Sequence, residues 1–231
     1  MKKYSCVFFD LDHTLWDYDA NCEEALRDLH EAYGLHNRSD HTFDHFHSHF
    51  VTINTELWDQ YDRGIIHRDV IRYERFHKIL QAVGIDDYFL SLELSKEYVI
   101  RSPKKTNLVE NALDILDYLR GRYPLTIITN GFADIQATKL SSSGIDHYFD
   151  LVVTSEKVGH KKPAREIFEF ALKHRNAQAH EAIMIGDNLQ TDILGARNAG
   201  VDDVFFNPQR KTHGQKVFME IADLTELKSV L

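Results

Sequence analysis

The stretch CVFFDLDHTLWD, residues 6–17, joins an apolar run to two aspartates that are one residue apart. Residues 6–9 have the composition of a short buried strand, and Asp10 ends it. Side chains at i and i+2 of an extended chain point the same way, so Asp10 and Asp12 are expected close together at the strand end. Adjacent carboxylates repel unless something positive compensates them. The stretch therefore predicts either a turn or a metal or acid–base site.

Four later segments share the form of this first strand, since each is rich in β-branched or aromatic residues and ends in a polar residue. We predict strands at 124–130, 150–156, 181–187 and 201–207, and helices at 107–121, 132–143, 163–175, 190–199 and 222–231. This alternation predicts an α/β fold with a Rossmann-like, doubly wound parallel sheet. In such sheets ligands bind at the carboxyl ends of the strands.

Residues 17–100 interrupt the alternation directly after the first strand. They contain no convincing pair of strands and have the pattern of amphipathic helices, for example at 40–61, 68–82 and 87–99. We therefore predict an α-helical domain at 17–100, inserted into an α/β core made of 1–16 and 101–231. An insert at this point would lie over the carboxyl edge of the sheet, where a lid belongs.

Composition and charge indicate the class of protein. The chain has 231 residues, of which 43% are hydrophobic and 27% charged, as in ordinary soluble globular proteins. Its net charge of −9 disfavours binding to nucleic acid or to an anionic membrane surface. The two cysteines form no disulfide framework, and neither a signal peptide nor a transmembrane segment is apparent. We expect a cytoplasmic protein, and the sequence does not predict its oligomeric state.

Polar residues suited to catalysis stand at the ends of the predicted strands. They are Asp10, Asp12 and Thr14 after the first strand, Thr129, Asn130 and Gly131 at the second, Lys162 after the third, and Asp187 and Asp192 at the fourth. Each set alone has a simpler explanation as a turn, a helix cap or a solvated lysine. Together, in this order, they predict one site at the carboxyl edge of the sheet.

The carboxylates in this set predict a magnesium site and a nucleophile. Asp10 and Asp187 can share a hard divalent cation, and Mg²⁺ prefers carboxylates, water and phosphate. Such a cation would remove the repulsion in the opening stretch. Asp10 is then also a candidate nucleophile, as carboxylates are in aspartyl-phosphate chemistry. Asp12 could protonate the leaving oxygen and then activate water.

The other residues of the set predict phosphate binding. Donors to phosphate oxygens are offered by Thr129, Asn130 and the backbone N–H of Gly131. Lys162 offers a positive charge for the phosphoryl group in the transition state. We expect Asp192 to support Asp187 or Lys162 rather than to touch the metal, and we give Thr14 a similar supporting place.

The segments DLDHTL (10–15), ITNG (128–131), KKP (161–163) and GDNLQTD (186–192) resemble the four motifs of the haloacid dehalogenase superfamily. The resemblance implies a Rossmann-like core with a helical cap after the first motif. It implies that Asp10 is the nucleophile and Asp12 the acid/base. Mg²⁺ would be bound by Asp10, the backbone carbonyl of Asp12, and Asp187. The phosphate contacts that it implies are Thr129, Asn130 and Lys162.

Three longer stretches are similar to the phosphatases of this superfamily that include pyrimidine 5′-nucleotidases: 54–66, 128–140 and 149–172. This similarity implies a small phosphorylated metabolite as substrate, and specifically a pyrimidine nucleoside 5′-monophosphate. The acid at Asp12 argues against dehalogenation, because dehalogenating relatives lack an acid there. The alternatives are a sugar-phosphate phosphatase, a phosphomutase, or a catalytically silent phosphate-binding protein.

The segment HTFDHFHSHF (41–50) is rich in histidine. His41, His45 and His49 fall at i, i+4 and i+8, along one face of a predicted helix. This spacing can hold zinc. The interleaved phenylalanines form the apolar stripe, which favours a solvated or lid-facing surface for the histidines over a metal site, with substrate contact as a further alternative. The sequence does not decide among these.

Overall fold

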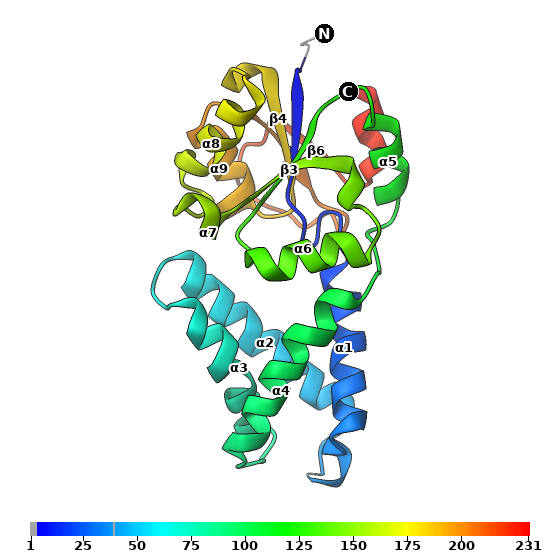
Figure 1. Cartoon of the computed structure of the whole chain (residues 1–231), viewed down its shortest axis with the longest axis vertical. Coiled ribbons are helices and arrows are strands. Elements are labelled where there is room, and N and C mark those ends of the chain that lie inside the picture. Colours follow the sequence, from blue (N-terminus) through cyan, green and yellow to red (C-terminus); the bar gives the residue numbers. More distant parts are fainter. Residues whose placement is uncertain (1–3, 39) are drawn as a thin grey trace. The chain divides into compact units, whose positions relative to one another are not determined.

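The computed structural model describes residues 4–38 and 40–231, which divide into two compact units (Figure 1). The first unit combines Met1–Tyr18 with Thr106–Leu231, and the second is Asp19–Lys105. The first is called here the core unit and the second the inserted unit. None of the described helices has both the length and the apolar character that crossing a bilayer requires.

In the described part of the chain, the core unit is built on a six-stranded parallel sheet in the order β3-β2-β1-β4-β5-β6. The strands are β1 (Cys6–Phe9), β2 (Leu125–Thr129), β3 (Phe149–Thr154), β4 (Ala182–Gly186), β5 (Asp202–Phe206) and β6 (Met219–Ile221). The predicted α/β fold is confirmed. Because β1 lies between β2 and β4, the carboxyl ends of these three strands are neighbours, and the sheet brings together residues far apart in the sequence.

Both faces of the sheet are covered, which explains why β1 is apolar at every position. Val7 and Phe9 pack into one hydrophobic cluster with helix α5 (Ala112–Leu119), and Cys6 and Phe8 into another with helix α8 (Arg165–Arg175). Figure 1 shows α5 on one side of the sheet and α8 and α9 on the other. This alternation is the period of two that a strand imposes on its side chains.

The other helices of the core unit are shorter than the sequence pattern suggested. They are α6 (Ala133–Ser142), α7 (Ser155–Val158), α9 (Leu194–Asn198), a π-helical turn at Leu189–Ile193, and 3₁₀ turns at Asp146–Tyr148, Ala179–Glu181 and Leu224–Ser229. The helix predicted at 107–121 begins only at Ala112, because Asn111 adopts a left-handed conformation with φ 64°. The strand β6 was not predicted, since three residues at a sheet edge carry too short a pattern.

The start of helix 107–121 was predicted wrongly because this segment is extended. Residues 15–17 run antiparallel to residues 107–109, with a bridge between Trp16 and Leu108. The backbone hydrogen bonds of the pair are Asp17 N to Asn107 O (3.1 Å) and Val109 N to Leu15 O (2.9 Å). We call this two-stranded pair the stem. It belongs to the core unit and flanks both ends of the inserted unit.

The inserted unit is helical. Its helices are α1 (Tyr18–Ala32), α2 (Phe43–Asp62), α3 (Arg68–Ala82) and α4 (Tyr88–Arg101), with 3₁₀ turns at Leu35–Asn37 and Ser102–Lys104. The rings of Phe50, Phe76 and Tyr98 pack together with centroids 5.4 to 6.1 Å apart. The buried Arg75 guanidinium lies 4.4 Å from the Tyr98 ring centroid and donates to Asn54 Oδ1 at 2.9 Å.

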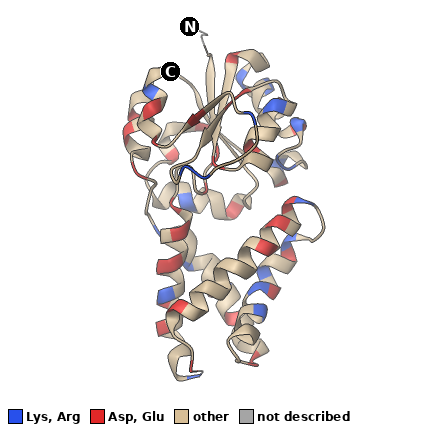
Figure 2. Ribbon diagram, turned by 180° about the vertical axis from the view of Figure 1, so that it is seen from behind, with Lys and Arg blue, Asp and Glu red and all other residues tan. Residues whose placement is uncertain are grey.

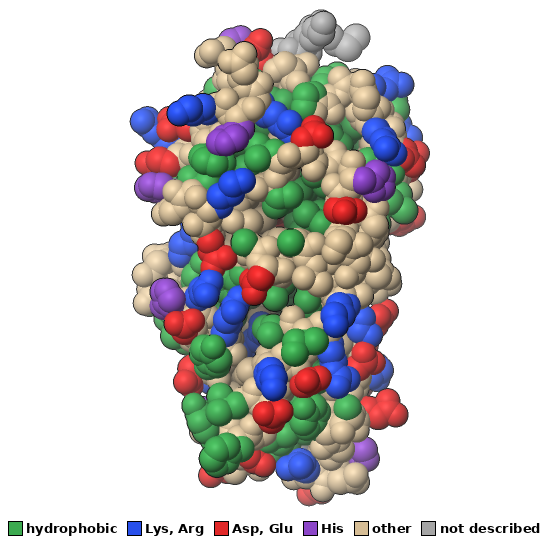
Figure 3. Space-filling view, in the orientation of Figure 1, with side chains coloured by type: hydrophobic (Ala, Val, Ile, Leu, Met, Phe, Trp, Pro, Cys, Tyr) green, Lys and Arg blue, Asp and Glu red, His purple; other side chains and the backbone are tan. Residues whose placement is uncertain are grey.

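Charged residues of both signs alternate along the helices of the inserted unit (Figure 2). Several of them pair one turn apart, as Arg27 does with Glu23 at 2.7 Å and Arg101 with Glu97 at 2.8 Å. The space-filling view shows acidic and basic side chains mixed over the visible face, with apolar side chains between them (Figure 3). This is the ordinary outer face of amphipathic helices.

Candidate active site

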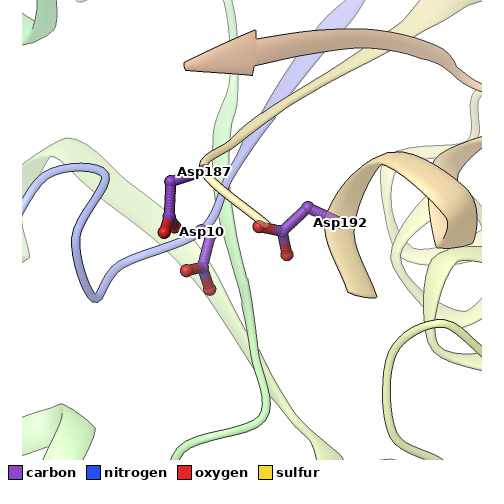
Figure 4. Close-up of side chains that lie close together, drawn as sticks. All are labelled: Asp10, Asp187 and Asp192. Carbon is purple, nitrogen blue, oxygen red and sulfur yellow. The ribbon is translucent and has the colours of Figure 1, made fainter. Parts of the chain in front are cut away.

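The candidate site lies where β1 and β4 end. Asp10 directly follows β1, and its backbone N–H donates to Ile185 O of β4 at 2.9 Å. Asp187 directly follows β4, and Asp192 lies in the π-helical turn after it. Figure 4 shows the side chains of these three aspartates close together. One carboxylate oxygen from each lies within 4.8 Å of those of the other two.

A single buried ammonium group lies against this acidic cluster. Lys162 Nζ is 2.6 Å from Asp10 Oδ1, 2.6 Å from Asp192 Oδ1, and 2.7 Å from Ile128 O. Burial disfavours the charged lysine, but the two carboxylates outweigh burial and raise the pKa of Lys162 above its usual value. Of the two partners that the sequence offered for Asp192, the structure places it against Lys162.

The acidic cluster carries more negative charge than Lys162 compensates. Burial, together with Asp192 and Asp187, raises the pKa of Asp10 well above its usual value, even though Lys162 opposes this. Burial and then Asp192 raise the pKa of Asp187 to about 7. Both shifts mean that repulsion among the buried carboxylates destabilises the fully ionised cluster in the absence of a further cation. Carboxylate oxygens are the ligands of hard divalent cations, so the residues fit Mg²⁺.

Thr14 and Gly186 position the carboxylates of the acidic cluster. Thr14, which is fully buried, donates through Oγ1 to Asp187 Oδ1 at 3.1 Å and fixes that carboxylate. Gly186 leaves room for Asp192, because a Cβ at this position would lie 2.3 Å from Asp192 Oδ2. The same Asp192 oxygen accepts a hydrogen bond from Asn188 N at 3.0 Å. Thr14 therefore lies where a residue supporting Asp187 was expected.

Asp12 does not join the acidic cluster, and its side chain is compensated by a different lysine. Lys139 Nζ lies 2.5 Å from Asp12 Oδ1, and Gln136 Nε2 donates to Asp12 Oδ2 at 2.9 Å. Burial alone would raise the pKa of Asp12, but Lys139 and then Gln136 lower it below its usual value. The predicted repulsion between Asp10 and Asp12 is therefore relieved by two separate lysines. A metal contact through the backbone carbonyl of Asp12 stays a prediction.

Lys139 and Gln136 were missed by the sequence analysis. Both belong to α6, one helical turn apart, and both are buried. Lys139 Nζ also lies 4.2 Å from the centroid of the Trp16 ring, which is itself fully buried. In the sequence, Gln136 and Lys139 have the spacing of polar residues on the solvent-exposed face of a helix. The signal that could have found them is their place in the helix that follows the ITNG segment at the end of β2.

The residues at the end of β2 reach the site, but their polar groups are bound within the chain. Thr129 Oγ1 accepts from Gly131 N at 3.0 Å and from Gln136 Nε2 at 2.7 Å. Asn130 Oδ1 accepts from Lys162 N at 2.8 Å, and Asn130 Nδ2 donates to Lys162 O at 3.1 Å. Asn130 thus holds the backbone of Lys162 in place. The predicted donation by Thr129, Asn130 and Gly131 to phosphate stays a prediction.

Comparison with known proteins shows the family of this chain. Residues 7–206 match the model of the haloacid dehalogenase-like hydrolases. The chain belongs to this family. The predicted superfamily and the prediction of a hydrolase are thereby confirmed. In this haloacid dehalogenase-like hydrolase the match runs from Val7 in β1 to the end of β5, and so includes every residue of the candidate site.

Three relatives show how this hydrolase compares with other members of the family. It is 30% identical to the HAD-hydrolase YfnB of Bacillus subtilis over 100% of this chain and 97% of that one. A crystal structure of YfnB bound to magnesium matches with a TM-score of 0.88 over 99% of each chain. This chain is also 27% identical to pyrimidine 5′-nucleotidase YjjG of Escherichia coli, over 99% of this chain and 98% of that one. It is 30% identical to a glyceraldehyde 3-phosphate phosphatase of Methanothermobacter thermautotrophicus, over 97% of this chain and 98% of that one.

Proposed function

We propose that this hydrolase is a Mg²⁺-dependent phosphomonoesterase that forms an aspartyl-phosphate on Asp10. Its substrate would be a small phosphorylated metabolite, and specifically a pyrimidine nucleoside 5′-monophosphate. The observation that carries the proposal is the separation of two acidic groups at one sheet edge. Asp10 lies in a charge-rich cluster with Lys162, while Asp12 is held apart from that cluster by Lys139.

The proposed metal ligands are Asp10, Asp187 and the backbone carbonyl of Asp12. When bound, Mg²⁺ would neutralise the clustered carboxylates and the negative charge of the phosphate group. Lys162 would neutralise further charge on the phosphoryl oxygens while it keeps Asp10 in position. Thr129, Asn130 and Gly131 lie beside these groups and would orient the phosphate once it has entered.

The two aspartates of the first motif divide the chemistry. An Asp10 oxygen forms a bond to phosphorus as the bond between phosphorus and the leaving oxygen breaks, and Asp12 gives its proton to that oxygen. Asp12 then takes a proton from water, and the resulting hydroxide attacks the phosphorus to release phosphate and restore Asp10. Lys139 stabilises the carboxylate form of Asp12, which is the form that the first step leaves and from which the second step starts.

Support for a nucleotide substrate comes from the relatives rather than from the core unit. YjjG, a pyrimidine 5′-nucleotidase, matches this chain over nearly its whole length. A glyceraldehyde 3-phosphate phosphatase matches it at similar identity, which makes a sugar or triose phosphate the second candidate substrate. We also propose that Asp19–Lys105 acts as the cap that selects among substrates, because it is inserted directly after the first motif.

The experiment that tests the function is phosphate release by the purified protein, with and without Mg²⁺, over a panel of substrates. The panel contains pyrimidine and purine 5′-monophosphates, triose and hexose phosphates, and p-nitrophenyl phosphate. We expect Mg²⁺-dependent turnover that is highest for pyrimidine monophosphates and is abolished in Asp10→Asn. Preference for triose or hexose phosphates would keep the mechanism and overturn the nucleotidase assignment.

Two further outcomes separate the remaining alternatives. Conversion of a sugar phosphate to its isomer without phosphate release would identify a phosphomutase. Binding of phosphate esters without turnover of any of them would identify a binding protein and overturn the proposal. Trapping of radiolabelled phosphate on the wild-type chain but not on Asp10→Asn would support the covalent intermediate.

A further inference from the structure

Three imidazole rings form a row at the start of α2, within the inserted unit and outside the acidic cluster. His41 precedes the capping residue Thr42 and therefore lies just before the helix, whereas His45 and His49 lie on its first turns. The Nδ1 atoms of His41 and His45 are 2.6 Å apart, and the Nε2 atoms of His45 and His49 are 3.0 Å apart. His45 thus directs one ring nitrogen to each neighbour.

The short distance between the Nδ1 atoms of His41 and His45 fits a hydrogen bond, with one proton between the two nitrogens. A hydrogen bond there needs one N–H and one lone pair. When His45 Nδ1 carries the proton and His41 Nδ1 accepts it, the neutral His45 ring has a lone pair on Nε2. That lone pair faces the Nε2 of His49. Two nitrogen ligands of one tetrahedral zinc ion, each about 2.0–2.1 Å from the metal, are roughly 3.3 Å apart.

We propose that His45 and His49 form a site for a divalent transition-metal ion of the Zn²⁺ class, which they bind through Nε2. His41 is a positioning residue that holds His45 in the tautomer with a proton on Nδ1. A metal-binding histidine commonly donates its other ring N–H to a neighbour in this way. The site is independent of the proposed phosphatase function, and neither the family match nor the named relatives point to it.

The histidine row is accessible to an ion in solution. His45 is exposed, and His41 and His49 are partly exposed. With two protein ligands, the ion would keep open positions for water and would exchange more readily than in a closed structural site.

The chemistry of the ligands separates this site from the acidic cluster. Imidazole nitrogen suits Zn²⁺, Cu²⁺ and Ni²⁺, whereas carboxylate and water suit Mg²⁺. A solution that holds Mg²⁺ in excess therefore fills the carboxylates and leaves the histidines open to a transition metal. This difference allows the site to be tested in the full chain.

The test is a calorimetric titration of the full chain with Zn²⁺ in the presence of excess Mg²⁺. We expect His45→Gln and His49→Gln each to remove one binding equivalent. His41→Gln should keep that equivalent but weaken it roughly 10- to 100-fold, as is usual for loss of a group that orients a ligand. His47→Gln is the matched control, because His47 is on the same helix but stacks on Phe43, with ring centroids 5.8 Å apart.

A second readout identifies the ligand atoms. The electron paramagnetic resonance spectrum of one equivalent of Cu²⁺ should show coupling to two imidazole nitrogens in the wild type and in His47→Gln. It should show coupling to one in His49→Gln. Phosphatase activity with Mg²⁺ and without added transition metal should be unchanged in all four variants.

Several results would overturn the proposal. Equal Zn²⁺ binding by His45→Gln and His47→Gln would mean that the row is only hydrogen-bonded. A loss in His41→Gln as large as that in His45→Gln would make His41 a ligand and remove its positioning role. A higher KM for substrate in metal-free His45→Gln would make the histidines a substrate contact instead.

Discussion

At the scale of single residues, Lys139 is the group on which the state of Asp12 depends. Its ammonium lies 2.5 Å from Asp12 Oδ1 and is itself nearly inaccessible to solvent. The sequence predicts Asp10, Asp12, Asp187 and Asp192 as site residues because they follow predicted strand ends, which are local patterns, and because the sets occur together in order. Lys139 could not be placed in this way, since only the packing of α6 turns it inward.

We predict that Lys139→Met lowers kcat by roughly 10- to 100-fold with little change in KM, within the range that general acid–base groups contribute. Without the ammonium, the pKa of Asp12 rises, so Asp12 gives its proton to the leaving oxygen less readily. With p-nitrophenyl phosphate, whose leaving group needs little protonation, the first step should stay fast. The loss of kcat should therefore be larger for a nucleoside monophosphate than for p-nitrophenyl phosphate, and steady-state kinetics on the two substrates measures this difference.

Two variants control the Lys139 experiment. Lys139→Arg keeps the positive charge and should recover part of the rate. Lys173→Met removes an exposed lysine at the end of α8 and should leave kinetics unchanged. A Lys139→Met enzyme with wild-type kcat on both substrates would show that Asp12 does not depend on this contact.

Gly186 gives a second residue-scale prediction. A methyl group here would meet Asp192 Oδ2 at 2.3 Å, so Gly186→Ala must displace the carboxylate from Lys162 and Asn188. We expect a loss of about 1–3 kcal/mol in the free energy of unfolding, as for other overpacked sites. Urea unfolding measures this. Gly214→Ala is the control, because no atom lies within 4 Å of a Cβ at that position; equal stability of the two variants would contradict the account.

At the scale of elements, the predictions from sequence succeeded where a pattern was long and failed where it was short or interrupted. The apolar runs of β1 and β4 and the inserted helices were found because each repeats its period over several residues. The three residues of β6 offered almost no repeat. His41 looked like part of a helix by spacing, but Thr42 caps α2 and leaves His41 outside it.

The last 3₁₀ segment is an element whose stability depends on one cap. Asp223 Oδ1 accepts from Thr225 N at 2.7 Å, and its Oδ2 accepts from Asn111 Nδ2 at 2.8 Å, next to the start of α5. We predict that Asp223→Ala lowers the free energy of unfolding by about 1 kcal/mol, the usual loss for a cap. Chemical denaturation of this variant beside Asp146→Ala, an exposed aspartate, tests it. An equal effect of the two changes would show that Asp223 has no capping role.

At the scale of the whole molecule, the acidic cluster links metal binding to stability. Since the carboxylates repel in the metal-free state, Mg²⁺ should stabilise the native protein. At a concentration one hundred times the Kd the gain is about 2.7 kcal/mol, or roughly 5–10 °C in Tm for a chain of this size. Thermal unfolding with and without Mg²⁺ measures it. Asp187→Asn should abolish the gain, and a gain that persists would place the metal elsewhere.

The same cluster predicts how the stability of the metal-free protein depends on pH. Asp187 has a pKa of about 7 in the native state and an ordinary value of about 3.9 when unfolded. Between these values the native state binds more protons, so stability falls as pH rises from about 4 to about 7. Tm measured against pH in chelator should fall less steeply for Asp187→Asn than for wild type. Parallel curves would contradict the shift.

The stem has a consequence for how this enzyme can be rebuilt. Because residues 15–17 and 107–109 are hydrogen-bonded to each other, the inserted unit enters and leaves the core at one point. A segment that connects residue 17 to residue 107 has to span only a short distance. The entropy cost of closing such a connection rises slowly with its length. The stem is thus a natural splice site. A helical segment transplanted there from another member of the family would join an unaltered core unit, so that the proposed role of the insert in substrate selection could be tested without redesign of the sheet.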